Sequence, residues 1–245
     1  MTQIQATGNS VAPLRNVMAL EELVERVRGR SYGLPGMAVF YGFSGYGKTT
    51  AATHAANTFN AYYVQLKSVW TKKTLCEAIL TDLGIPPRRN IADMVHQISE
   101  EIARTGRPLL IDEADYLVNR NMVELVRDIY ESSEATIILI GEEQLPVKLQ
   151  QWERFHGRML DWVPAEPADQ DDTRLLARLY SADITIADDL LEDLTNASGG
   201  SIRRICVNLD RLREFARTRG LRALDRASWD GGFFNGLPPK PRGRK

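Results

Sequence analysis

The sequence predicts an α/β protein, with a parallel sheet sandwiched between helices and a small all-helical lid after it. Short apolar segments alternate with amphipathic ones over roughly the first 165 residues, which is typical of strands alternating with helices. The expected strands are apolar almost throughout, as strands buried on both faces of a parallel sheet should be. From Asp169 onward only helical spacing is present.

The N-terminal elements follow from apolar spacing and local composition. Residues 17–28 carry apolar side chains three or four positions apart, which predicts a helix that ends before the Gly33/Pro35/Gly36 cluster. The apolar run 37–41 predicts a buried strand. The alanine-rich residues 48–57 predict a helix, and residues 61–66 predict the second strand.

The middle of the chain continues the alternation. Residues 72–83 and 91–104 each carry a one-sided apolar stripe and predict two helices. The apolar run 108–111 predicts a third strand, 121–131 a helix, and 135–140 a fourth strand, which Gly141 closes.

The pattern changes after Gly141, where a helix is expected over 145–155 and a short last strand over 160–163. Pro164 and Pro167 then indicate a domain boundary. The lid helices are expected at 169–180, 188–197 and 201–219. The predicted organisation is a flexible N-terminal segment (1–14), an α/β core (15–165), a helical lid (166–226) and a basic, Pro-rich tail (227–245).

Composition excludes several classes of protein. No apolar run approaches the ~20 residues of a membrane span, and the N-terminus lacks the features of a secretory signal. Cys76 and Cys206 lie in helix-like patterns and are expected to be free thiols, and the three histidines have no metal-ligand spacing. We therefore expect a cytoplasmic protein that does not contact a membrane.

Charge is distributed unevenly, although the formal net charge is only −1. Residues 203–245 hold twelve Lys/Arg and four Asp/Glu, so the rest of the chain is acidic. A basic C-terminal part on an acidic body fits contact with a polyanion or an acidic partner. A solvated helix face followed by a solubilising tail is the alternative.

Residues 42–49 read Gly-Phe-Ser-Gly-Tyr-Gly-Lys-Thr and match the phosphate-loop (Walker A) pattern in full. The loop lies between a predicted strand and a predicted helix, which is the context that the motif requires. Its glycines let backbone N–H groups face a polyphosphate, Lys48 can reach the β- and γ-phosphates, and the Thr49 hydroxyl can ligate Mg²⁺. The expected nucleotide-binding residues here are Gly42, Phe43, Ser44, Gly45, Tyr46, Gly47, Lys48, Thr49 and Thr50.

A second motif, Leu-Leu-Ile-Asp-Glu-Ala-Asp at 109–115, brings acids to the end of the third predicted strand. Asp112 can hold the nucleotide-bound Mg²⁺, so Thr49 and Asp112 are the expected metal ligands. Glu113 can act as the general base that polarises the attacking water. Asp115 is expected to be a helix N-cap or a surface acid.

The paired motifs and the helical lid resemble the AAA+ ATPases over about residues 15–220. Within that group, Asp-Glu-Ala-Asp with the Ile-Ile-Leu-Ile-Gly-Glu-Glu-Gln-Leu stretch at 137–145 is similar to the MuB, TnsC, IstB and TniB family of DNA transposition proteins. The chain is too short before the core for the N-terminal helix-turn-helix domain of MuB itself.

The resemblance implies further roles. Arg203, in Gly-Gly-Ser-Ile-Arg-Arg, matches the lid arginine that contacts the nucleotide. Arg158, or alternatively Arg154, matches the arginine finger that acts on a neighbouring subunit's nucleotide, which requires a head-to-tail ring or helical filament. Glu142 occupies the position where relatives carry a polar γ-phosphate sensor, so a sensor role is doubtful for an acid.

The resemblance also places DNA near residues 67–73, where Lys67, Lys72 and Lys73 could contact phosphates and Trp70 could stack. A solvated helix start with a packed Trp70 is the alternative. The implied function is an ATP- and Mg²⁺-dependent ATPase that oligomerises on double-stranded DNA and delivers it to a transposase, in a bacterial or phage-infected cell. Two alternatives remain: a replication initiator or helicase- or clamp-loading ATPase, and a non-catalytic nucleotide-binding adaptor.

Overall fold

A computed structural model describes residues 13–237, in two compact units. One unit spans Asn16–Glu166, and the other contains Arg15 and the residues from Pro167 onward. Parts of the expected N-terminal segment and tail, residues 1–12 and 238–245, lie outside the described residues. No helix among residues 13–237 is long and apolar enough to cross a membrane.

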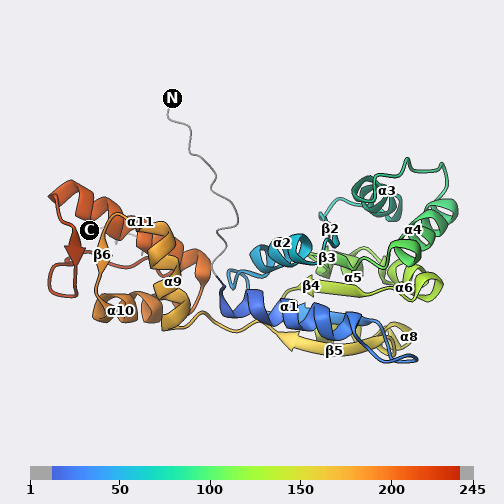
Figure 1. The fold of residues 1–245 in the computed structure, drawn as a ribbon, viewed down its shortest axis with the longest axis horizontal. Coiled ribbons are helices and arrows are strands. Elements are labelled where there is room, and N and C mark those ends of the chain that lie inside the picture. The colour runs from blue at the N-terminus through green and yellow to red at the C-terminus, as the bar shows by residue number, and fades with distance from the viewer. Residues whose placement is uncertain (1–12, 238–245) are drawn as a thin grey trace, which may run out of the picture. The chain divides into compact units, whose positions relative to one another are not determined.

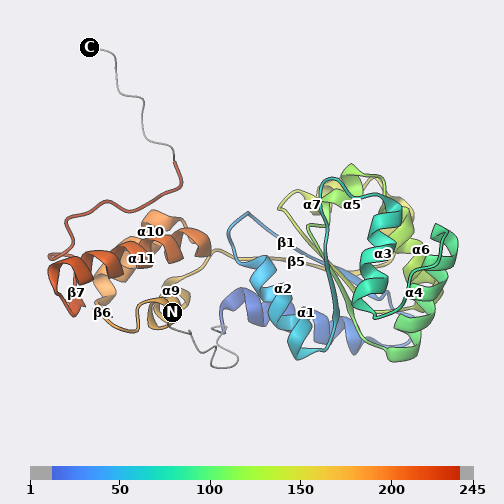
Figure 2. The same cartoon turned by 90° about the horizontal axis from the view of Figure 1, so that it is seen from above.

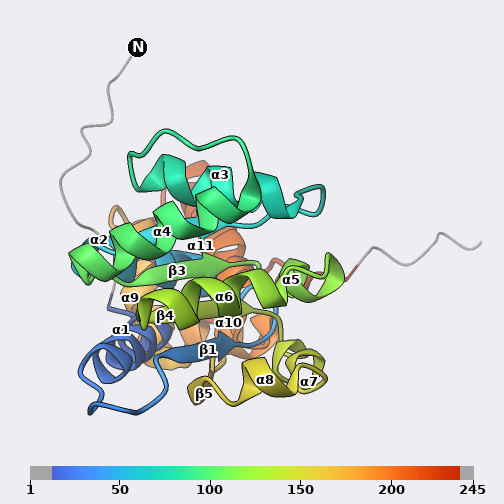
Figure 3. The ribbon, with the colours of Figure 1, turned by 90° about the vertical axis from the view of Figure 1, so that its right-hand side faces the viewer.

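The first unit contains a five-stranded, all-parallel sheet in the order β2-β3-β4-β1-β5. Four of these strands follow one another from top to bottom in Figure 3. The strands are β1 (Met37–Tyr41), β2 (Tyr62–Gln65), β3 (Leu109–Asp112), β4 (Ile137–Gly141) and β5 (Met159–Pro164). Strands β3 and β4 are buried along their whole length, as the near-continuous apolar runs predict.

Helices cover both faces of this sheet (Figure 1). In Figure 2, α1 and α2 lie on one side, and α3, α4 and α6 lie on the other. The helices of this unit are α1 (Arg15–Arg28), α2 (Lys48–Thr58), α3 (Lys72–Asp82), α4 (Ile91–Thr105), α5 (Asp115–Asn119), α6 (Val123–Ser133), α7 (Leu145–Leu149) and α8 (Glu153–His156). Because all strands are parallel, their carboxyl ends meet at one edge, where the phosphate loop, Asp112 and Gly141 lie.

Two predicted helices are shifted or divided. The segment expected as a helix over 121–131 runs over Val123–Ser133 and is preceded by the separate short helix α5. The segment expected over 145–155 is divided into α7 and α8, with Trp152 between them in a non-helical conformation. Its indole packs against the core, and the backbone turns there to bury Phe155 as well.

The second unit is built on α9 (Gln170–Tyr180), α10 (Asp188–Ser198) and α11 (Ile202–Arg219). The structure adds a two-residue parallel strand pair, β6 (Thr185–Ile186) with β7 (Ala223–Leu224), to the helices that the sequence predicts. Strands of two residues are too short to leave a period-2 pattern in the sequence.

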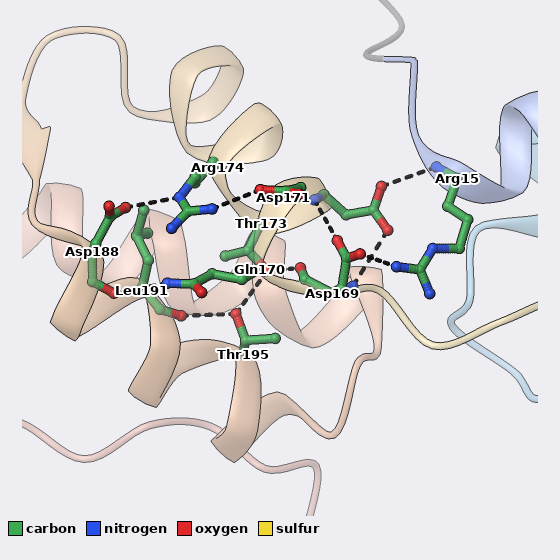
Figure 4. A network of polar contacts seen from close by, with 10 residues as sticks. Arg15, Asp169, Gln170, Asp171, Thr173, Arg174, Asp188, Leu191 and Thr195 are labelled. Carbon is green, nitrogen blue, oxygen red and sulfur yellow. Dashed lines mark hydrogen bonds and ion pairs between the residues drawn. The ribbon is translucent and has the colours of Figure 1, made fainter.

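The start of α9 is fixed by side-chain capping (Figure 4). The Asp169 carboxylate accepts a hydrogen bond of 2.9 Å from the Asp172 N–H, and the Asp172 carboxylate accepts in return from the Asp169 N–H. Asp172 also accepts from the Arg15 N–H, and the Arg15 guanidinium pairs with Asp169. The Thr195 hydroxyl on α10 lies 2.7 Å from the Leu191 carbonyl oxygen and 2.8 Å from the Thr173 hydroxyl, and the second contact joins α10 to α9.

Candidate nucleotide-binding site

The phosphate loop connects β1 to α2, as the motif predicts. Gly45 and Gly47 have φ of 90° and 83°, which side chains with a Cβ rarely adopt, so glycine is required at both positions. Gly47 is the N-cap of α2 and uses no side chain for capping. The first N–H groups of α2 therefore remain available to an anion at the positive end of the helix.

Lys48 lies over this loop. Its ammonium group donates to the carbonyl oxygens of Gly42 at 2.6 Å and Phe43 at 3.0 Å. Burial lowers the pKa of Lys48, and the charges of Asp112, Glu113 and Glu142 oppose that shift. Lys48 is thus a cation held at the loop, where it can reach phosphate oxygens.

Asp112 and Thr49 are brought together across 63 residues of sequence. The Thr49 hydroxyl donates to Asp112 Oδ2 at 2.8 Å, and the Asp112 side chain is almost completely buried. A hydroxyl and a carboxylate side by side suit Mg²⁺, which keeps several of its waters. Residues 13–237 contain no cluster of three or more His, Cys, Asp or Glu side chains that could hold another metal.

Two residues that sequence reasoning missed support Asp112 from β2. The Tyr63 hydroxyl donates to Asp112 Oδ2 at 3.0 Å, and the Gln65 amide lies 3.5 Å from the same oxygen. The register Gln65↔Asp112 between β2 and β3 produces this contact. Burial, followed by the Asp112 charge, raises the pKa of Tyr63, so its hydroxyl remains a donor.

A third missed residue, Asn16, fixes the phosphate loop from α1. Its side-chain amide donates to the Tyr46 carbonyl at 2.9 Å and to the Glu166 carbonyl at 2.7 Å. Its side-chain oxygen accepts from the Glu166 N–H at 2.9 Å. The spacing of Asn16 from Leu20 and Leu23, which puts a polar residue on the apolar stripe of α1, is the sequence signal that could have identified it.

Glu113 directly follows Asp112 and has a φ of 55°, which is rare for a residue with a Cβ. Its N–H donates to Asp112 Oδ1, so the backbone of Glu113 fixes the orientation of the Asp112 carboxylate. Burial, followed by the Asp112 charge, raises the pKa of Glu113, while Lys48 opposes the shift. A backbone held in a rare conformation beside a perturbed carboxylate is typical of functional sites.

Asp115 is not a surface acid, contrary to our expectation, because its side chain is buried at the first position of α5. Asp115 Oδ2 accepts from the Glu142 N–H at 2.7 Å, and Oδ1 accepts from the Lys148 ammonium at 2.7 Å. A Cβ on Gly141 would lie 2.5 Å from Asp115 Oδ2, which explains the glycine at the end of β4. Asp115 thus joins the segment after β3 to the segment after β4.

The two predicted finger arginines lie at the opposite edge of the sheet. Arg158 immediately precedes β5, and its carbonyl accepts from the N–H of Met37 at the start of β1. Its guanidinium pairs with Glu131 at 2.6 Å, whereas no ion pair of Arg154 is found within residues 13–237. Arg158 and Arg154 line the same hollow of about 740 Å³.

The remaining predicted residues belong to other elements. Arg203 is exposed in the first turn of α11, in the helical unit. Lys67, Lys72 and Lys73 are exposed near the start of α3, and Lys73 also pairs with Glu77. Trp70 is partly buried against the hydrophobic core of its own unit. The roles proposed for these residues in nucleotide and DNA binding stay predictions.

A family model described as "AAA domain" matches residues 32–149. Residues 32–149 are therefore similar to an AAA domain. This assignment and the strand order confirm the predicted AAA+ fold, with a helical region after it. An AAA domain of this kind is a nucleotide-binding domain, typically with Mg²⁺.

Several solved structures share the fold. The ADP form of the Aeropyrum pernix ORC2 protein matches with a TM-score of 0.66 and 15% identity, over 89% of this chain and 68% of that one. The Aeropyrum pernix ORC1 protein in complex with DNA matches at 0.62 and 16%, over 87% and 62%. The Thermotoga maritima RuvB Holliday junction branch migration motor matches at 0.57 and 20%, over 85% and 64%. No curated protein matches the sequence.

These comparisons support one part of the sequence-based interpretation, the AAA+ fold, but not the transposition family. They support an AAA+ protein structurally similar to the ORC, Cdc6 and RuvB proteins, and they offer no specific support for the transposition family. The chain spans about two thirds of the length of these solved chains, and at 15–20% identity the likeness shows the fold alone.

Proposed function

We propose that this protein is a Mg²⁺-dependent ATPase that acts on DNA and completes its active site only between neighbouring copies. The observation that carries the proposal is the grouping of Lys48, Thr49, Asp112 and Glu113 at the carboxyl edge of the sheet, with Arg158 at the other edge. This is the set of groups that phosphoryl transfer needs, divided between two edges of one sheet.

The residues of the carboxyl edge bind and orient the nucleotide. The N–H groups at the start of α2 donate to phosphate oxygens, and Lys48 exchanges its loop carbonyls for the β- and γ-phosphates. Thr49 and Asp112 would hold Mg²⁺, which would supply positive charge to offset the charge that develops on the phosphates. Tyr63 keeps the Asp112 carboxylate oriented.

Glu113 accepts the proton of the attacking water. Burial raises the pKa of Glu113 toward neutral pH, so its carboxylate is a stronger base than that of an ordinary glutamate. Arg158 cannot serve its own nucleotide, because the five-residue strand β1 separates the two edges by roughly 15 Å. It would leave Glu131 and stabilise charge on the nucleotide of the next copy.

The solved structures with this fold favour one class of DNA transaction over another. They include an ORC1 protein in complex with DNA and a branch migration motor, which favours a replication-initiator or helicase-loading type of ATPase. Delivery of target DNA to a transposase is the second candidate, supported by the resemblance of residues 109–115 and 137–145 to the transposition ATPases. Co-purification with a replicative helicase would favour the first candidate, and co-purification with a transposase the second.

Hydrolysis of ATP by the purified chain tests the catalytic assignment. Lys48→Ala should abolish nucleotide binding, and Glu113→Gln should preserve binding while reducing turnover by at least 10²-fold. Glu100→Gln, which changes an exposed carboxylate on α4, is the matched control and should hydrolyse ATP normally. Normal turnover in Glu113→Gln would refute the base assignment.

DNA binding is tested separately by gel shift, with and without a non-hydrolysable ATP analogue. We expect nucleotide-dependent, sequence-independent affinity that weakens steeply with salt, as phosphate contacts require. Substituting Lys67, Lys72 and Lys73 together by Gln should reduce the affinity and the slope of its salt dependence. Equal DNA affinity in the presence and absence of nucleotide would contradict the proposal.

A further inference from the structure

The carboxylate of Asp112 uses most of its capacity to accept hydrogen bonds within the protein. Its Oδ2 accepts from the Thr49 hydroxyl at 2.8 Å and from the Tyr63 hydroxyl at 3.0 Å, and the Gln65 amide adds a weaker contact at 3.5 Å. Its Oδ1 accepts from the Glu113 N–H at 2.8 Å. A carboxylate offers about two acceptor positions on each oxygen, so Oδ2 is filled and about one position is open on Oδ1.

Strand β2 aims two side chains at this carboxylate. Tyr63 and Gln65 are two residues apart and therefore lie on the same face of the strand. The register Gln65↔Asp112 with β3 places them beside Oδ2, and the Leu66 N–H donates to the Asp112 carbonyl at 3.0 Å. The Tyr63 N–H donates to the Asp82 carboxylate at 2.8 Å, which ties this part of β2 to α3. The position of Tyr63 is thus fixed by contacts of the β2 backbone.

The open positions of Asp112 decide how a metal ion can use this carboxylate. Mg²⁺ keeps several of its waters and needs few carboxylate ligands, whereas Ca²⁺ is larger and takes about six to eight oxygen ligands, including carboxylates bound through both oxygens. Thr49 can give its oxygen to the metal and keep its hydrogen on Oδ2. With Tyr63 on the other position of Oδ2, Asp112 can reach a metal only through Oδ1 or through a water molecule. That arrangement suits Mg²⁺ and disfavours Ca²⁺.

We infer that Tyr63 is a specificity-determining residue for the metal ion: by occupying Oδ2, it prevents Asp112 from binding a metal through both oxygens and so favours Mg²⁺ over Ca²⁺. Tyr63 acts through Asp112 and is therefore a positioning residue. Since a hydroxyl adds no charge, Asp112 still attracts a cation, and only the way in which it binds the cation is restricted. The inference rests on the proposed function, because it requires that Thr49 and Asp112 hold the metal of the bound nucleotide.

The variant Tyr63→Phe removes the hydroxyl and keeps the ring. The affinity for a fluorescent ATP analogue is measured at saturating Mg²⁺, at saturating Ca²⁺ and in EDTA, which reports metal binding independently of hydrolysis. Wild type should bind the analogue roughly tenfold more tightly with Mg²⁺ than with Ca²⁺, since the site suits an ion that keeps its waters. In Tyr63→Phe that ratio should fall by about tenfold, because a charge-assisted hydrogen bond that restrains Asp112 is lost, while the affinity in EDTA is unchanged.

Tyr62→Phe is the matched control on the same strand. The Tyr62 hydroxyl lies 3.4 Å from Thr105 Oγ1, and successive side chains of a strand point to opposite faces, so this change leaves Asp112 untouched. The ratio of the two affinities should stay at the wild-type value. Gln65→Met, which removes the weaker contact, should lower the ratio by less than Tyr63→Phe does. Thermal melts check that all three variants fold.

The waters on the metal ion give a second readout. With Mn²⁺ as the probe, broadening of its EPR lines by ¹⁷O-labelled water counts the waters that remain bound in the nucleotide complex. Tyr63→Phe should show fewer bound waters than wild type, because both oxygens of Asp112 can then reach the ion. An equal count in the two proteins would overturn the inference, since a purely structural role of Tyr63 would not change the coordination of the metal.

The outcomes separate this inference from the proposed function. If Lys48→Ala binds the analogue like wild type, or if neither metal changes the affinity of wild type, the proposed nucleotide site fails. If wild type prefers Mg²⁺ and Tyr63→Phe keeps the same preference, only the role of Tyr63 fails. Three other results would also overturn the inference alone: a wild type that does not prefer Mg²⁺, equal weakening with both metals in Tyr63→Phe, or an equal change of the ratio in Tyr62→Phe.

Discussion

The buried ion pair between Asp115 and Lys148 gives the sharpest test of how the nucleotide edge is built. Replacing Asp115 with Ala removes two hydrogen bonds of 2.7 Å, one to the Glu142 N–H and one to the Lys148 ammonium. Each is charge-assisted and is worth about 1.5–3 kcal/mol when buried. Because the Lys148 side chain is 33% exposed and can recover water, we expect a total cost of about 3 kcal/mol.

A double-mutant cycle isolates the ion pair. Lys148→Met alone should cost about 1–2 kcal/mol, since it leaves the Asp115 carboxylate with only the Glu142 N–H. The double variant should be more stable than the sum of the single costs predicts, by about 1 kcal/mol of coupling. The assay is urea unfolding followed by tryptophan fluorescence.

The direction of the pH effect gives an independent check. The hydrogen bond to Asp115 raises the pKa of Lys148, so its stabilising contribution is complete below about pH 10, the ordinary lysine value. That contribution is lost as the pH rises through the higher folded-state pKa. Additive single costs, or an Asp115→Ala cost below about 1 kcal/mol, would refute the reasoning.

Three further predictions concern other residues. Asn16→Ala should lower the free energy of unfolding in urea by about 2–3 kcal/mol and weaken nucleotide binding, because three hydrogen bonds that position the phosphate loop and Glu166 are lost. Unchanged nucleotide affinity would show that the Asn16 side chain does not position the loop. Because the pKa of Glu113 is raised, this carboxylate is protonated in the free enzyme at a higher pH than an ordinary glutamate, whose pKa is about 4.3. On acidification kcat/KM should therefore fall at a pH above about 4.3, and a fall only at or below that pH would contradict the prediction. Cys76 is buried, and burial raises the pKa of its thiol to about 11. A thiol reagent at about pH 8 should therefore modify the partly exposed Cys206 first, and faster labelling of Cys76 would show that α3 opens.

The local motifs were predictable because they are continuous in sequence. The phosphate loop lies where its eight residues indicate, and Asp112 ends a buried strand as the apolar run before it predicts. The fold class followed from the same alternation of apolar and amphipathic segments. The break between α7 and α8 could not be predicted, because the apolar side chains on both sides of Trp152 fit one continuous helix.

By itself, the sequence determined an AAA+ sheet, a helical region after it, and a phosphate loop with an acid at the end of the third strand, because periodicity and contiguous motifs encode these directly. Only the tertiary structure decided which distant side chains complete that site. Asp115 is buried rather than exposed because Glu142 and Lys148 meet it across the ends of β3 and β4. Tyr63 and Asn16 belong to the site because strand register and helix packing bring them there, and contacts over that chain separation leave no local pattern in one sequence.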